Sequence, residues 1–205
     1  MAHYRKPLAA AVALNTLIFV VEGAAGFEVN SLSLMMDSVH NLSDEMALVF
    51  LYLAFILPLG ISRNLMRSAN LFNSVGLVAV SGILLWQAVL RFNHPVPVPG
   101  LVPLLVGLAA AAGNWGVARL LRDPGRDNPA IRLAYIHNLG DIQVSLAPVV
   151  SGLLAMATGS PLFDPLVAGA IAVWIVGSTL REVVLSHEEL IWPGKIECGH
   201  SDHQK

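Results

Sequence analysis

Long apolar stretches constrain the fold of this chain most strongly. Hydrophobic residues make up 55% of the 205 residues and charged residues only 13%, about half of the ~25% usual for soluble domains. The apolar residues form six blocks, each about the length that a helix needs to cross the ~30 Å core of a bilayer. The sequence therefore predicts an all-α membrane protein with six transmembrane helices. The predicted spans are Leu8–Gly26, Leu32–Leu57, Leu71–Phe92, Gly100–Leu121, Ala130–Ala157 and Leu162–Leu185.

Polar segments and prolines predict where these spans end. Pro58, Gly60 and the polar stretch Ser62–Asn70 are expected to break the chain between the second and third spans. The segment Arg122–Pro129 is expected to form a polar turn between the fourth and fifth spans.

Basic residues predict the orientation in the membrane, because lysine and arginine favour the cytoplasmic side. With the N-terminus inside, eleven of the twelve basic residues fall on the inner side and Arg91 alone borders the outside. Both termini are therefore expected to be cytoplasmic. The inner residues are Arg5, Lys6, Arg63, Arg67, Arg119, Arg122, Arg126, Arg132, Arg181, Lys195 and Lys205.

The phrase His-Asn-Leu-x-Asp occurs twice, from His40 to Asp44 and from His137 to Asp141, each time inside a predicted span. A spacing of four residues places the imidazole and the carboxylate on one face of a helix. An aspartate at the centre of a membrane helix costs ~2.5–3.5 kcal/mol on insertion scales. A single copy is compatible with an interhelical hydrogen bond, but two copies favour a shared ligand.

The predicted topology makes the second and fifth spans antiparallel. If these helices are neighbours, each histidine can approach the aspartate of the other helix near the middle of the membrane. Small residues on the fifth span, Gly140 and Ala134, are expected to permit that close approach.

Two imidazoles and two carboxylates are a suitable donor set for a divalent transition metal. Zinc fits best because it prefers four nitrogen and oxygen ligands in a tetrahedron. Histidine also titrates near physiological pH, and protons compete with metal for its ring nitrogen. Metal could therefore be exchanged for protons. Asn41 and Asn138 are expected to pack around the ligands and to orient them.

Three further polar residues occur in the predicted spans. Asp37 lies one turn before His40, and Asn15 and Glu22 belong to the first span. For each of them a functional role and an interhelical hydrogen bond are both open interpretations. The histidines and Cys198 after the last span lack a regular zinc-ligand spacing and favour a solvated tail.

Around these residues the chain resembles the cation diffusion facilitator family of metal transporters. The segment from Ser31 to Asp44 is similar to the phrase Ser-Leu-x-Leu-x-x-Asp-x-x-His-x-x-x-Asp on the second helix of that family. The second histidine–aspartate pair resembles its fifth-helix motif, and Asp164-Pro165 resembles the start of its sixth helix.

The resemblance implies a proton-coupled antiporter, usually a homodimer, that exports divalent metal, and its histidine–aspartate set is associated with zinc and often cadmium. We expect zinc to be carried by alternating access. The resemblance also implies that the metal ligands are His40, Asp44, His137 and Asp141. Members of the family usually carry a cytoplasmic domain after the sixth helix, and we expect a form that lacks it. The expected organisation is a transport domain over residues 1–190 and a short cytoplasmic tail over 191–205.

Rival interpretations are the same carrier with Cd²⁺, Co²⁺, Fe²⁺ or Mn²⁺ as its main substrate, and an intramembrane zinc hydrolase. The hydrolase is disfavoured because the chain has no His-Glu-x-x-His phrase. We therefore expect a transporter and not an enzyme. A net charge of −2 gives no reason to expect a nucleic-acid partner. The expected partners are the metal ion, the lipid bilayer and a second copy of the chain, in a bacterial inner membrane.

Overall fold

The computed structural model describes residues 2–56 and 63–185, and within these ranges the chain forms helices and no strands. Six helices are long, and a short one lies in the polar turn that the sequence predicts. The helices are α1 (Ala2–Glu28), α2 (Leu32–Ile56), α3 (Arg63–Asn93), α4 (Leu101–Arg122), α5 (Pro124–Asp127), α6 (Pro129–Thr158) and α7 (Phe163–Leu185).

Each of the six predicted spans coincides with one long helix. Five of these helices are long and apolar enough to cross a membrane. The exception is α2, which is also long but carries Asp37, Asp44 and Glu45. The predicted tail over 191–205 lies outside the described residues.

The predicted start of the third span is wrong. The third helix was expected to begin at Leu71, after a polar break over Ser62–Asn70, but α3 already begins at Arg63. Polarity misleads here because arginine, leucine, methionine and alanine, which all occur in this stretch, are good helix formers. The polar residues therefore extend the helix beyond its apolar part.

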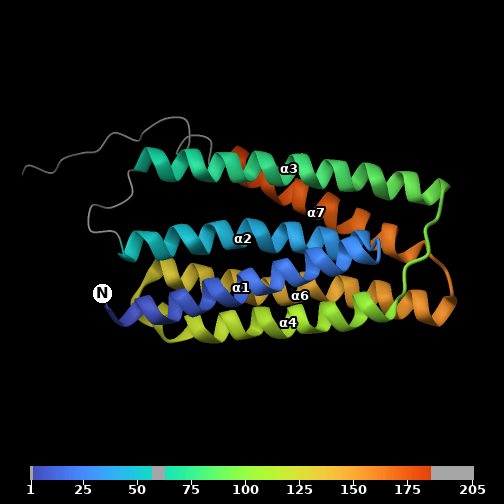
Figure 1. Cartoon of the computed structure of the whole chain (residues 1–205). Helices are drawn as coiled ribbons and strands as arrows, with labels where there is room; N and C mark the ends of the chain where they lie inside the picture. The colour runs from blue at the N-terminus through green and yellow to red at the C-terminus, as the bar shows by residue number, and fades with distance from the viewer. Residues whose placement is uncertain (1, 57–62, 186–205) are drawn as a thin grey trace, which may run out of the picture.

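The long helices form two groups that lie side by side (Figure 1). Helices α1, α2, α4 and α6 pack around one another, while α3 packs mainly on α7. The first group encloses an apolar cluster that includes Leu8, Val117 and Ile131. A second cluster, including Met36 and Ile175, joins α2 to the α3–α7 pair. Helix α2 thus lies at the junction of the two groups.

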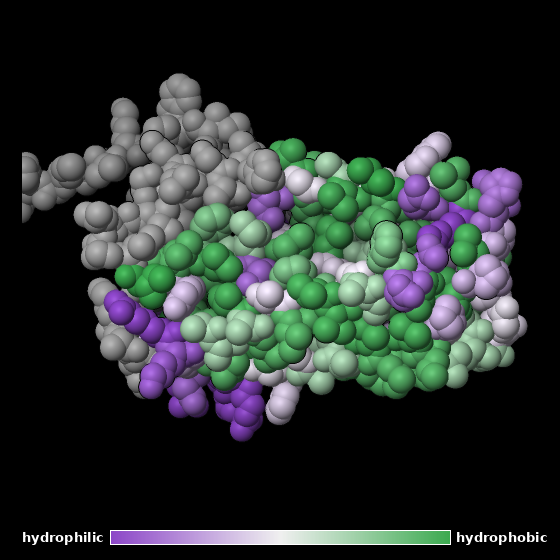
Figure 2. Space-filling model, viewed as in Figure 1, coloured by the Kyte–Doolittle hydropathy of each residue, from purple (hydrophilic) through white to green (hydrophobic). Residues whose placement is uncertain are grey.

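The surface fits a lipid environment. Figure 2 shows apolar side chains over most of the visible middle of the bundle, with hydrophilic side chains gathered toward its two ends. Large apolar residues face outward on several helices, among them Leu17, Ile83 and Trp174. Successive long helices run in opposite directions (Figure 1), so that the first and last described helix ends lie on the same side.

The start of α2 is held by a carboxylate from another helix. Asp164 of α7 accepts a 2.7 Å hydrogen bond from the backbone N–H of Leu32. The hydroxyls of Ser31 and Ser33 each donate to its other oxygen at 2.7 Å. Arg91 of α3 lies 3.9 Å from the same carboxylate. This cap fixes α2 relative to both helices of the second group.

Glycines bring α4 and α6 close together. A Cβ atom at Gly107 of α4 would lie 2.9 Å from a methyl group of Val149 and 3.0 Å from the carbonyl oxygen of Ser145, both on α6. The expectation for Gly140 is wrong, because a Cβ at that position would meet nothing within 4 Å. The close approach of α6 is to α4, and the polar side chains of α6 bridge the distance to α2.

Candidate metal centre

The two repeated phrases occupy equivalent positions on antiparallel helices. Counted from the first residue of each helix, His40 and Asp44 are the ninth and thirteenth residues of α2. His137 and Asp141 are the ninth and thirteenth residues of α6. In helices of 25 and 30 residues these positions lie near the middle. The start of α6 is fixed by Asn128, whose side chain accepts hydrogen bonds from the first two free backbone N–H groups.

All four predicted side chains come together. The Nε2 atom of His137 lies 2.8 Å from Oδ1 of Asp44, and Nε2 of His40 lies 3.3 Å from Oδ1 of Asp141. Each histidine therefore lies against the aspartate of the opposite helix. Within the helices, the imidazole–carboxylate distances are 3.6 Å from His40 to Asp44 and 3.9 Å from His137 to Asp141.

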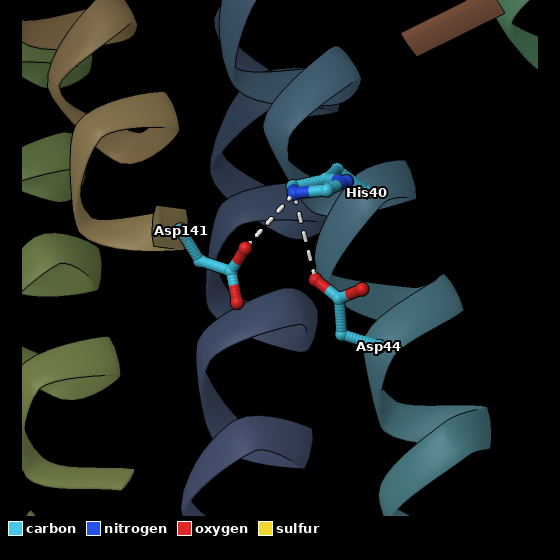
Figure 3. A group of neighbouring side chains, drawn as sticks. All are labelled: His40, Asp44 and Asp141. Atoms are coloured by element: carbon cyan, nitrogen blue, oxygen red, sulfur yellow. Dashed lines mark hydrogen bonds and ion pairs between the residues drawn. The ribbon is translucent and has the colours of Figure 1, made fainter. Parts of the chain in front are cut away.

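Figure 3 shows three of these residues, with His40 pointing between the two carboxyl groups. Ligand atoms of His40, Asp44 and Asp141 all lie within 4.8 Å of one another, and these residues are buried. Ligands bound to zinc at about 2.1 Å in a tetrahedron are ~3.4 Å apart. The observed nitrogen–oxygen distances, from 2.8 to 3.9 Å, bracket that value.

The charge of the cluster suits a cation. One oxygen of Asp44 and one of Asp141 are buried without a hydrogen-bond partner. In the described part of the chain, neither carboxylate pairs with a lysine or an arginine. A divalent ion would satisfy these oxygens and neutralise both carboxylates, which matters in a medium of low dielectric constant.

The four residues are not equally enclosed. The side chain of His137 is 51% exposed, whereas that of His40 is 9% exposed. Helix α7 also reaches the cluster, because the ring of Trp174 meets the ring of His40 edge-on at a centroid distance of 5.9 Å. This contact could not be predicted from the sequence, since Trp174 lies in a helix without any repeated motif.

A network of polar side chains surrounds the cluster on the α1 and α4 side. Asn41 donates a 2.7 Å hydrogen bond to Glu22 of α1, and its side-chain oxygen accepts one from Asn114 of α4. Asn114 also donates to Ser145 of α6. The packing role expected for Asn41 thus extends to four helices. Asn138 instead donates to the carbonyl oxygen of Ala134 in its own helix.

A second branch of this network holds Glu45, the residue after Asp44. One oxygen of Glu45 accepts a 2.7 Å hydrogen bond from the hydroxyl of Thr16, and the other accepts one from Asn15 at 3.2 Å. Asn15 also donates to the backbone carbonyl of Asn41. These contacts join α1 to α2 directly beside the cluster, and no spacing in the sequence indicates them.

The fold and the cluster define a class of protein: a multi-pass helical membrane protein with a histidine–carboxylate centre between two antiparallel helices. Residues 8–191 match the family model of the cation efflux transmembrane domain. The chain belongs to this family, in agreement with the resemblance found in its sequence.

Among curated proteins, the chain is 28% identical over 185 residues to the cadmium, cobalt and zinc/H⁺-K⁺ antiporter of Bacillus velezensis, covering 85% of the chain and 59% of that protein. It is 29% identical over 181 residues to the zinc transporter ZitB of Escherichia coli, covering 84% of the chain and 58% of ZitB. The human proton-coupled zinc antiporter SLC30A2 is 24% identical, over 88% of the chain and 55% of its own length. The chain thus spans about three fifths of the length of the first two relatives.

Proposed function

We propose that this protein carries divalent transition-metal ions, with Zn²⁺ as the main substrate, out of the cytoplasm in exchange for protons. The observation that carries the proposal is the meeting of two imidazoles and two carboxylates from antiparallel helices at one point, where His40, Asp44 and Asp141 are buried. The names of the relatives, which include zinc transporters and antiporters, support the same assignment.

The proposed ligands are His40, Asp44, His137 and Asp141. The carboxylates supply negative charge, and the imidazoles supply nitrogen ligands that protons can displace. In the proposed cycle the ion binds from the cytoplasm, the bundle changes its access to the other side, and protons compete for the ring nitrogens as the ion leaves. The proton gradient then provides the difference in affinity that drives export.

Flux measurements in proteoliposomes test the proposal. Purified protein is reconstituted, a pH gradient is imposed, and uptake of Zn²⁺, Cd²⁺, Co²⁺, Fe²⁺ and Mn²⁺ is followed together with internal pH. We expect zinc flux that depends on the gradient and moves protons in the opposite direction. If another metal were transported better than zinc, that metal would replace zinc as the assigned main substrate. The absence of any metal flux would refute the proposed transport function.

Replacement of the carboxylates tests the ligand assignment. We expect Asp44→Ala and Asp141→Ala each to reduce zinc flux to the level of empty vesicles, because each removes a ligand and half of the compensating charge. The matched control is Asp123→Ala, since the Asp123 side chain is 82% exposed and distant in sequence from the cluster. Retained flux in either cluster variant, with the control active, would contradict the assignment.

The same proposal covers the setting of the protein. We propose that it lies in a bacterial inner membrane as a homodimer. Its transport domain would cover residues 1–190, with both ends of the chain in the cytoplasm. We propose no enzymatic activity. The bacterial relatives support the proposed location in a bacterial inner membrane. Cross-linking of the reconstituted protein would test the dimer.

A further inference from the structure

Two carboxyl groups that the metal cluster does not use are buried where α1 meets α2 inside the bundle. Glu22 of α1 accepts a hydrogen bond from Asn41 of α2, and Asp37 lies four residues before Asn41 on the same face of α2. Glu22 and Asp37 are 1% and 0% exposed. Asp37 precedes His40 by three residues, so the pair lies about one helical turn from the cluster.

The pair lacks hydrogen-bond donors. Asn41 donates to one oxygen of Glu22 at 2.7 Å. The other oxygen of Glu22 and both oxygens of Asp37 are buried without a partner that meets hydrogen-bond geometry. In the described residues, no lysine or arginine forms an ion pair with either carboxyl group.

The titratable groups that face the pair do not neutralise it. The nearest titratable groups along α2 and across it on α6 are His40, one turn after Asp37, and Asp141, whose carboxylate lies 3.3 Å from the His40 ring. Helix α4 contributes only the amide of Asn114 to the network. Among the described contacts, no hydrogen bond or ion pair joins Asp37 to His40, Asp44 or Asp141. The pair is therefore close to the metal cluster but separate from it.

Two adjacent carboxylates cannot both keep their charge in such a place, because like charges repel and burial removes water. One proton held between them removes a charge and gives an unsatisfied oxygen a donor. We infer that Glu22 and Asp37 share a proton and form a proton-binding site, distinct from the metal ligands, that is loaded and emptied during transport.

Loading and emptying the Glu22–Asp37 pair forms and then breaks one O–H bond. A proton from water binds a carboxylate oxygen of the pair and forms an O–H bond. When a divalent ion enters the neighbouring cluster, its charge favours the ionised pair, the O–H bond breaks and water takes the proton. This inference rests on the proposed antiport and adds a second group of proton carriers beside the histidines.

The test is Glu22→Gln in the full-length protein, which keeps the shape of the side chain but cannot ionise. An amide at this position can also donate to Asp37. The control is Glu28→Gln, the same change at an exposed position of the same helix. In proteoliposomes we expect the number of protons exchanged per zinc ion to fall by about one in Glu22→Gln and to stay unchanged in the control. Zinc binding, measured by calorimetry, and zinc–zinc exchange should both persist.

The outcomes separate this inference from the proposed function. An unchanged proton-to-zinc ratio in Glu22→Gln, with wild-type antiport intact, would overturn the shared proton site alone. Loss of zinc binding in that variant would also overturn it, because the residue would then belong to the metal site. Zinc flux without proton movement in the wild type would instead overturn the antiport. If Glu22→Gln does not fold, Asp37→Asn carries the same test.

Discussion

At the residue scale, the contact between Trp174 and His40 provides an optical probe of the cluster. The two rings meet edge-on, at 72° between their planes. The electronic surroundings of the indole therefore depend on whether His40 is neutral, protonated or bound to metal. We expect the fluorescence of the purified protein to change when zinc is added, and acid to weaken this response because protons compete for the same nitrogen.

Two substitutions check that this signal comes from the cluster. Trp174→Phe should abolish the response to zinc without abolishing zinc binding, as measured by calorimetry. Trp115→Phe is the matched control, since Trp115 is similarly exposed but lies on α4 beneath Arg119. A response that survives in Trp174→Phe and disappears in Trp115→Phe would contradict the assignment.

The meeting of the candidate ligands could be predicted because they repeat. An imidazole and a carboxylate four residues apart lie on one face of a helix. Because the same pair occurs on a second apolar helix, the pattern also indicates which two helices meet. The surrounding groups could not be predicted in the same way. Trp174, Asn114 and Ser145 belong to separate helices, and only packing brings them together. The free space at Gly140 likewise depends on the rotation of α6, which composition does not specify.

At the scale of single elements, Asp164 determines how α2 begins. Its buried carboxylate accepts from the backbone N–H groups of Leu32 and Ser33, at 2.7 and 3.3 Å, and from the hydroxyls of Ser31 and Ser33. We expect Asp164→Ala to lower the free energy of unfolding by about 2–3 kcal/mol, since it removes a cap and leaves buried donors unpaired. Denaturation in detergent, compared with Asp127→Ala at an exposed position, measures this. Equal stability of the two variants would exclude the cap as a major contribution.

A second prediction concerns the close contact between helices α4 and α6. Gly107→Ala would place a methyl group 2.9 Å from Val149 and should lower the free energy of unfolding by ~1–3 kcal/mol through overpacking. Gly82→Ala is the control, because a Cβ there meets nothing within 4 Å. Thermal unfolding of both variants in detergent gives the comparison. A Gly107→Ala protein as stable as the control would mean that the two helices can move apart at little cost.

The position of each long helix could be predicted from the sequence more reliably than its ends. Apolar blocks of about twenty residues leave few alternatives to a spanning helix. The start of α3 at Arg63 could not be predicted from hydropathy, because hydropathy detects the apolar part of a helix and not the polar residues that continue it. The break at Pro58 and Gly60 falls outside the described residues.

At the scale of the whole molecule, the distribution of basic residues predicts which end of the bundle faces the cytoplasm. Arg122, Arg126 and Arg132 lie around the α4–α6 connection, whereas Arg91 lies near the opposite end. Single cysteines in a Cys198→Ser background test this orientation. A cysteine at Val96 should react with an impermeant maleimide added outside intact cells, and one at Arg126 should react only after the membrane is opened. The reverse pattern would invert the topology.

The matching positions of the two motifs have a mechanical consequence for release. Each of the two central helices contributes one nitrogen and one oxygen donor, at the same count from its own start. A tilt or slide of either helix therefore withdraws an imidazole and a carboxylate in a single movement. If the four side chains bind one ion as proposed, such a movement would remove two of its four ligands together. Under that proposal, release would be coupled to the displacement of a whole helix.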